Sequence, residues 1–171
     1  MAADTARLAY LHALPSGLTL GLPDGRHLLI TAAGVQERTG DAAGTVAHPW
    51  GEVTDLAVEA RSRRVPGVGP ALLALSVAAE AIGLGGWVPD AAPVVASVGT
   101  PDGPRVVDCD GPAVHGYPPA RLAAAEAVLH LLTRHPDARR HLDDPARALA
   151  DARRAPSRRR LAETWGQACT C

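Results

Sequence analysis

The chain contains two pairs of apolar runs. Within each pair, the two runs are separated by the same turn sequence, Pro-Asp-Gly. The segment 18–31 (LTLGLPDGRHLLIT) carries Pro23-Asp24-Gly25 at its centre, and the segment 94–109 (VVASVGTPDGPRVVDC) carries Pro101-Asp102-Gly103. Proline presets the first turn position, aspartate suits the second, and glycine accepts a left-handed backbone. Each segment therefore predicts a β-hairpin, and the two together predict antiparallel sheet.

A further strand is predicted between the hairpins, within residues 48–64 (HPWGEVTDLAVEARSRR). From Trp50 onward, apolar side chains fall on one face of an extended chain and more polar ones on the other. This alternation is typical of a strand that is buried on one side only. The inward set is Leu56, Val58 and Ala60, and the outward set is Asp55, Ala57 and Glu59.

Helical periodicity is clearest from Pro118 to about His135, where apolar residues recur at intervals of three and four. Prolines start this helix, and Pro136 ends it. A second, short helix is predicted from Pro145 to about Arg154, capped by the preceding aspartate. The apolar stripe of the first helix consists of Leu122, Ala125, Val128, Leu129 and Leu132.

Two more segments carry less decisive patterns. Residues 2–13 (AADTARLAYLHA) predict a short helix with Leu8 and Leu11 on one side, ended by the Pro-Ser-Gly that follows. Residues 65–92 are compatible with a buried helix started by Pro70 or with a pair of buried strands. The Ala and Leu content favours the helix.

Composition narrows the class of protein. The chain has 171 residues, 47% of them hydrophobic, and a net charge of −1, with no Lys, Asn or Phe. The missing residue types have AT-rich codons, which points to a high-GC bacterium. A charge near zero argues against nucleic-acid or membrane-surface binding. No signal peptide or membrane span is visible, and three cysteines make no disulfide framework, so we expect a cytoplasmic protein.

The order of these elements resembles that of a bacterial pleckstrin-homology-like domain. The resemblance is carried by the hairpin 18–31, the segment HPWGEVTDLAV at 48–58 with Trp50 and Val53, the hairpin 94–109 and the helix 118–135. It implies an α+β fold, an antiparallel β-barrel or sandwich closed by a C-terminal amphipathic helix. We expect a β-rich domain over 1–142, followed at 143–171 by a short helix and an Arg-rich, Cys-containing tail.

The resemblance also implies binding rather than catalysis, because members of that family bind phosphoinositides, peptides or proteins. The first hairpin carries only Arg26 and His27 where phosphoinositide binders have a basic cluster. A protein or peptide partner is therefore expected. The candidate contacts are Arg61, Arg63 and Arg64, whose alternative interpretation is a solvated strand end.

Catalytic and metal-binding motifs are missing from the sequence. It contains no phosphate loop, nucleophile elbow or zinc-type His and Cys spacing, so we predict no catalytic residues, no metal and no cofactor. Gly67-Val68-Gly69 lacks the third glycine of a dinucleotide site and is interpreted as a turn. Asp108 and Asp110 flank Cys109 and could form a carboxylate pair for a cation, but a strand ending in a turn explains them better.

The C-terminal segment has three possible interpretations. It joins an arginine-rich stretch to Thr164, Cys169, Thr170 and Cys171. It could be a disordered end, a weak metal or redox pair, or a substrate for modifying enzymes. In the last case it resembles the core of a ribosomally made peptide natural product, in which Thr is dehydrated and Cys cyclised.

Two functions of different classes follow from the sequence. The first is a non-catalytic binding or interaction module that recognises a protein or peptide through an exposed sheet edge or loop. The second is a precursor whose C-terminal peptide, about 164–171, is modified by partner enzymes. The two differ in what the folded part is for, which is recognition of a partner in the first and presentation of a tail in the second.

Overall fold

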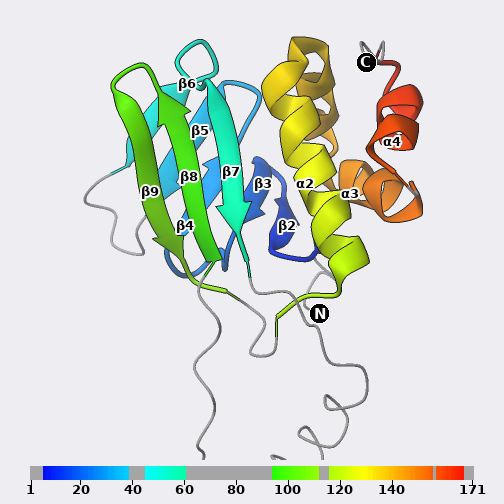
Figure 1. Ribbon diagram of the computed structural model, residues 1–171, viewed down its shortest axis with the longest axis horizontal. Helices are drawn as coiled ribbons and strands as arrows, with labels where there is room; N and C mark the ends of the chain where they lie inside the picture. The colour runs from blue at the N-terminus through cyan, green and yellow to red at the C-terminus, as the bar shows by residue number, and fades with distance from the viewer. Residues whose placement is uncertain (1–5, 39–44, 61–93, 112–115, 156, 168–171) are drawn as a thin grey trace, which may run out of the picture.

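A computed structural model describes residues 6–38, 45–60, 94–111, 116–155 and 157–167. Its first part is a six-stranded antiparallel sheet in which every strand pairs with its neighbours in sequence (Figure 1). The strands are β1 (Arg7–Leu8), β2 (Leu11–Leu14), β3 (Gly17–Leu20), β4 (His27–Ile30), β5 (Gly34–Arg38) and β6 (Val46–Pro49). The predicted hairpin 18–31 is confirmed as β3 and β4, with Leu18 opposite Ile30.

A three-stranded antiparallel sheet forms the second part, in the order β7-β8-β9. Its strands are β7 (Asp55–Glu59), β8 (Val94–Thr100) and β9 (Gly103–Cys109). The predicted hairpin 94–109 is confirmed as β8 and β9, and the turn is tighter than expected because Thr100 already pairs with Gly103. Along β8, alternate side chains enter the core, namely those of Val94, Ala96 and Val98.

The helices follow the sheets in sequence. They are α2 (Pro119–Arg134), the 3₁₀ helix η1 (Pro136–Asp143), α3 (Pro145–Arg154) and α4 (Arg158–Thr164). The predicted stripe of α2 is buried along its full length. Asp144 caps α3 as expected, because its side chain accepts a hydrogen bond from the Arg147 N–H. None of the helices in the described ranges is long and apolar enough to cross a bilayer.

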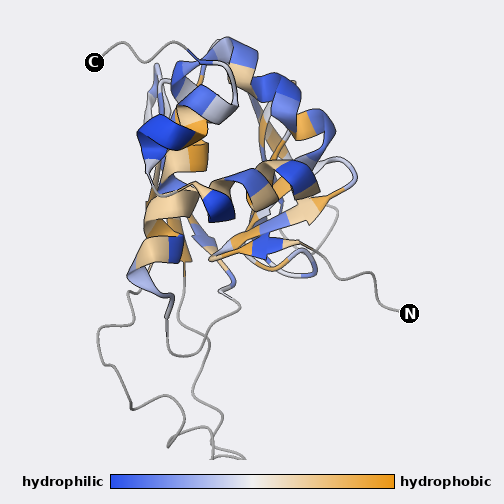
Figure 2. Ribbon diagram, turned by 90° about the vertical axis from the view of Figure 1, so that its right-hand side faces the viewer, coloured by the Kyte–Doolittle hydropathy of each residue, from blue (hydrophilic) through white to orange (hydrophobic). Residues whose placement is uncertain are grey.

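One hydrophobic core holds these parts together. Figure 1 shows α2 standing beside β7, so that the helix and the small sheet form one layer in front of the large sheet. Buried side chains of both sheets and of all four of these helical segments belong to a single cluster. In Figure 2 the apolar faces of the helices turn toward the strands, and their polar faces turn outward. The α+β class is thus confirmed.

The barrel expected from the resemblance is not formed among the described residues, because no strand pairing there joins the two sheets. They are linked instead at one corner. The end of β9 reaches the β3–β4 turn, where the Asp110 N–H donates to the Arg26 carbonyl at 2.9 Å and the Leu22 N–H donates to the Asp110 carbonyl at 2.9 Å. The Asp110 carboxylate also accepts from the Arg26 N–H at 2.8 Å.

One prediction of local structure was wrong, and a second was confirmed only in part. The segment 2–13 is not a helix where it is described, since residues 7–8 and 11–14 are strands that pair through a turn at Ala9 and Tyr10. The backbone of Ala9 adopts a φ of 50° to make that turn. The half-buried strand expected within 48–64 is confirmed as β7, whose outward residues are exposed and whose Leu56 is buried. It does not begin at Trp50, however, because the chain leaves the large sheet after Pro49 and enters the small one at Asp55. The predicted helix or strand pair at 65–92 lies outside the described residues.

Acid sensitivity is expected from His12 on β2, which is only 7% exposed and has no hydrogen-bond partner for Nε2 among the described residues. Burial lowers its pKa from 6.5 to about 4, and the nearby Arg7 adds to this effect. Below pH 6.5 the unfolded chain takes up a proton that the folded chain accepts only near pH 4. The free energy of unfolding should therefore decrease by about 3 kcal/mol as the pH is lowered from 6.5 to about 4.

The variant His12→Gln removes the titrating group and tests this prediction. Urea unfolding of both proteins at pH values across the window gives the free energy of unfolding of each. The wild type should lose more of this free energy on acidification than the variant does. Equal losses in the two proteins would show that His12 is not the source.

Candidate functional site

Most of the residues predicted as sites lie outside the described part of the chain. This holds for Arg61, Arg63 and Arg64, and for Cys169, Thr170 and Cys171. Their roles as partner contacts and as modification sites stay predictions. Thr164 is the member of these sets that the structure does describe.

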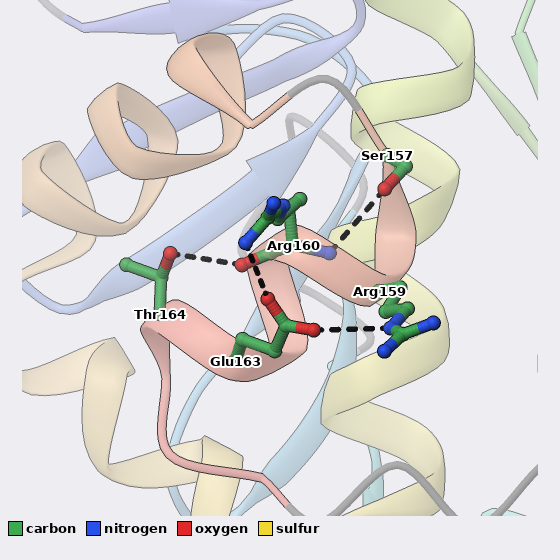
Figure 3. Close-up of polar contacts among 5 residues, drawn as sticks. All are labelled: Ser157, Arg159, Arg160, Glu163 and Thr164. Atoms are coloured by element: carbon green, nitrogen blue, oxygen red, sulfur yellow. Dashed lines mark hydrogen bonds and ion pairs between the residues drawn. The ribbon is translucent and has the colours of Figure 1, made fainter.

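Thr164 lies on a folded helix rather than on an extended tail. Its hydroxyl donates to the Arg160 carbonyl at 2.8 Å, and the Ser157 hydroxyl caps the start of α4 (Figure 3). The next residue, Trp165, is 1% exposed and belongs to the core. An enzyme that dehydrates Thr164 would therefore have to act on helical backbone beside a buried side chain. Modification of Thr164, like that of the residues after it, stays a prediction.

Of the two aspartates around Cys109, Asp110 has a structural role. Asp110 holds the β3–β4 turn, and Asp108 is exposed on β9. Burial raises the pKa of the Cys109 thiol to about 11, so this cysteine carries little thiolate at neutral pH. Within the described ranges, no group of three His, Cys, Asp or Glu side chains could hold a metal ion. The interpretation of this segment as a strand ending in a turn is the one that the geometry supports.

A groove of about 500 Å³ lies between β7 and α2. We call it the β7 groove. Its walls are Asp55–Val58 on β7, one face of α2 between Ala123 and Arg134, and Arg158 at the start of α4. Figure 1 shows β7 and α2 running side by side along its length. This volume lies within the range of sites that take a ligand or a short peptide segment.

The edge of β7 that faces this groove has no hydrogen-bond partner strand among the residues that the structure describes. Among the described residues, β7 pairs with β8 alone. The two-residue turn between β8 and β9 makes Thr100 part of a hydrogen-bonded pair with β9, and such pairs alternate along a strand. Ser97 therefore directs its backbone to β7, where its partner is Ala57. The flanking Leu56 and Val58 direct their N–H and C=O groups away from β8, toward the groove.

Side chains of the groove combine an apolar floor with charged rims. Leu56 and Leu129 are buried, while Glu126 and Arg134 are exposed. His130 has a lowered pKa, first because of its partial burial and then because of the nearby positive charges of Arg158 and Arg134. These three basic groups thus lie near one another in the groove. The site can thus hold an extended chain by its backbone and distinguish side chains by charge.

The sequence predicted the inward faces of β7 and α2, but it did not predict that the two elements form a groove. The alternation of Leu56 and Val58 with their outward neighbours was visible, as was the stripe of α2. Nothing in the sequence placed residues 55–58 beside residues 123–134, because that placement depends on tertiary packing. Comparison with known proteins adds no further assignment: no family model, no curated protein and no solved structure matches this chain.

Proposed function

We propose that this protein is a non-catalytic binding module with pleckstrin-homology-like architecture, acting in the cytoplasm of a high-GC bacterium. Its partner is an extended peptide segment of another protein, bound in the β7 groove. The observation that carries the proposal is the edge of β7 that no other strand of the described ranges covers, which opens onto a groove along α2. A peptide that adds a strand there satisfies the backbone groups of Leu56 and Val58.

The chemistry of the groove favours a peptide over other ligands. A free strand edge offers alternating donors and acceptors, which is the pattern that another extended backbone completes. The apolar floor at Leu56 and Leu129 gives every second peptide side chain a surface to cover. The rims carry acidic groups as well as basic ones, so the groove as a whole does not select for a polyanion.

Peptides for the test are selected from a random library on the intact, immobilised chain. Amide hydrogen exchange then reports where they bind. In the free protein the Val58 amide should exchange faster than the Ala57 amide, which is hydrogen-bonded to β8. The bound peptide should slow exchange at Val58 and Leu56 and leave Ala57 unchanged.

Two proline variants provide the matched comparison. Val58→Pro removes an N–H that faces the groove, whereas Val106→Pro removes one on the outer edge of β9, away from it. Edge strands tolerate proline where the N–H has no partner in the sheet. We expect Val58→Pro to weaken the selected peptides about tenfold, since a backbone hydrogen bond and close approach are lost. A library that yields no binder, or binders equally affected by both variants, would overturn the proposal.

A further inference from the structure

A second groove, of about 400 Å³, lies where α2 meets α3 and α4. Its charged lining residues are all basic, whereas the β7 groove has both acidic and basic ones. Three helices and one strand form it. Its floor and walls come from Leu8 on β1, residues 120–127 of α2, residues 152–155 at the end of α3, and residues 157–161 around the start of α4. We call it the arginine groove. It shares Ala123, Ala127 and Arg158 with the β7 groove, and its other arginines do not line that site.

Four arginines surround this groove, and none of its lining residues is acidic. They are Arg121, Arg153, Arg154 and Arg158, and all four are exposed. Within the described ranges none of them forms an ion pair. The guanidinium of Arg153 donates to the Arg7 carbonyl, which holds this side chain beside β1 and leaves its other N–H groups available.

Two neighbouring arginines on α4 have an acidic partner, which the arginines of the groove do not have among the described residues. Arg159 and Arg160 both pair with the Glu163 carboxylate, at 3.0 Å each, on the same short helix (Figure 3). Neither of them lines the groove. Basic residues on this helix thus have an internal carboxylate partner on one side and none on the other. Since the whole chain has a net charge of −1, the positive groove is a local feature and not a consequence of composition.

The floor of the groove limits the kind of anion that fits. It is built of small side chains, with Ala120, Ala124 and Ala127 on α2 facing Ala152 and Ala155 on α3. Small side chains let another backbone approach closely. The lining contains no aromatic ring on which a nucleic-acid base could stack. In the described part of the chain, the exposed large hydrophobic residues are on the sheets, so none stands beside the groove to enter a membrane.

We propose that the arginine groove binds an acidic segment of a partner protein. Two or more Asp or Glu side chains of the segment pair with the four guanidinium groups, and small or aliphatic residues between them lie on the alanine floor. Guanidinium and carboxylate groups form paired hydrogen bonds with matching geometry. The contact is separate from strand addition at β7 and gives the module a second point of recognition.

The test uses a short synthetic peptide of glutamate, leucine and alanine, together with its glutamine counterpart. Binding to the full chain is followed by fluorescence anisotropy at low and moderate salt. The glutamate peptide should bind, and its affinity should fall with salt because the contacts are ionic. The glutamine peptide should bind at least about tenfold more weakly. Equal binding of the two peptides, or no binding of the glutamate peptide, would contradict the proposal.

Two double variants with the same change in charge locate the site. Arg121→Gln with Arg154→Gln removes two groups from the groove, and Arg159→Gln with Arg160→Gln removes two from the far side of α4. The first should weaken the glutamate peptide about tenfold, and the second less than about twofold. Similar losses in both would show a general charge effect and overturn the assignment to this groove.

Two further ligands and one further variant separate the remaining possibilities. A single-stranded RNA oligomer and vesicles of anionic phospholipid are measured with the same proteins. Tighter binding of either one than of the glutamate peptide, lost in the groove variant, would replace the acidic segment with that ligand. Val58→Pro should leave binding of the glutamate peptide unchanged, so failure of strand addition at β7 is distinguishable from failure here.

Discussion

Replacing Trp165 with alanine should lower the free energy of unfolding by about 3–5 kcal/mol. This side chain is 1% exposed and is among the largest that are fully buried. Its ring stacks on His141 at a centroid distance of 4.5 Å and an interplanar angle of 14°. Its carbonyl accepts a hydrogen bond from Arg140 at 2.9 Å. Removal leaves a cavity between α4 and the rest of the core, because the surrounding backbone can collapse only in part.

Urea unfolding followed by circular dichroism measures this effect, and Thr164→Ala is the matched control. Thr164 is adjacent in sequence but exposed, and it loses one hydrogen bond to a helix carbonyl, so its variant should change stability by no more than about 1 kcal/mol. If Trp165→Ala were as mild as its control, residues 158–165 would be an appendage rather than part of the core.

Replacing Trp50 with alanine is expected to cost a similar amount, about 3–5 kcal/mol. Trp50 lies where the chain passes from the large sheet to the small one, and it is 8% exposed. Its Nε1–H donates to the Thr31 carbonyl at 2.9 Å. The Arg139 guanidinium lies 4.3 Å from its ring centroid and is itself held by hydrogen bonds to the Leu132 and Thr133 carbonyls. The indole thus links the turn between β4 and β5 to the end of α2 by way of Arg139.

Trp50→Phe separates the contributions of this side chain, because it keeps much of the buried area but loses the indole hydrogen bond. We expect it to cost about 1–2 kcal/mol. A double-mutant cycle with Arg139→Ala isolates the cation–π contact, for which a coupling of about 0.5–2 kcal/mol is expected. Zero coupling would mean that Arg139 acts only through its carbonyl contacts.

Turn chemistry and apolar spacing were enough to predict several elements of the fold. Both Pro-Asp-Gly sequences lie between paired strands, and the stripe from Leu122 to Leu132 is buried as the spacing indicated. These signals are local, since a turn or a helix face is determined by residues a few positions apart. The same locality explains why the α+β class could be predicted before the arrangement of its sheets.

The errors have equally local causes. Leu8 and Leu11 are three apart, as on a helix, but they face each other across a two-residue turn. Ala9 makes that turn with a φ of 50°, a conformation that alanine seldom adopts, so no turn residue marked it. The expected strand also ran through Gly51, whereas the chain turns there, between the end of β6 at Pro49 and the start of β7 at Asp55.

The two grooves could not be predicted because each is made by segments distant in sequence. Val58 on β7 and His130 on α2 meet through packing alone, and so do Leu8 and Ala152. The arginine-rich stretch was predicted to belong to a tail, yet Leu161 and Trp165, which follow it closely, are buried. The high density of charged residues suggested a segment that is exposed on all sides. One face of α4 nevertheless carries buried apolar side chains and packs into the core.

The sequential pairing of β1 to β6 has a consequence for the order in which this protein can acquire its structure. Each of these strands meets partners made just before or just after it, so pairing involves short loops and little loss of chain entropy. A ribosome that proceeds from the N-terminus releases the whole sheet before α2 exists. Until then the Leu-rich face of the nascent sheet is bare, and this interval is when aggregation or chaperone capture would compete most with native assembly.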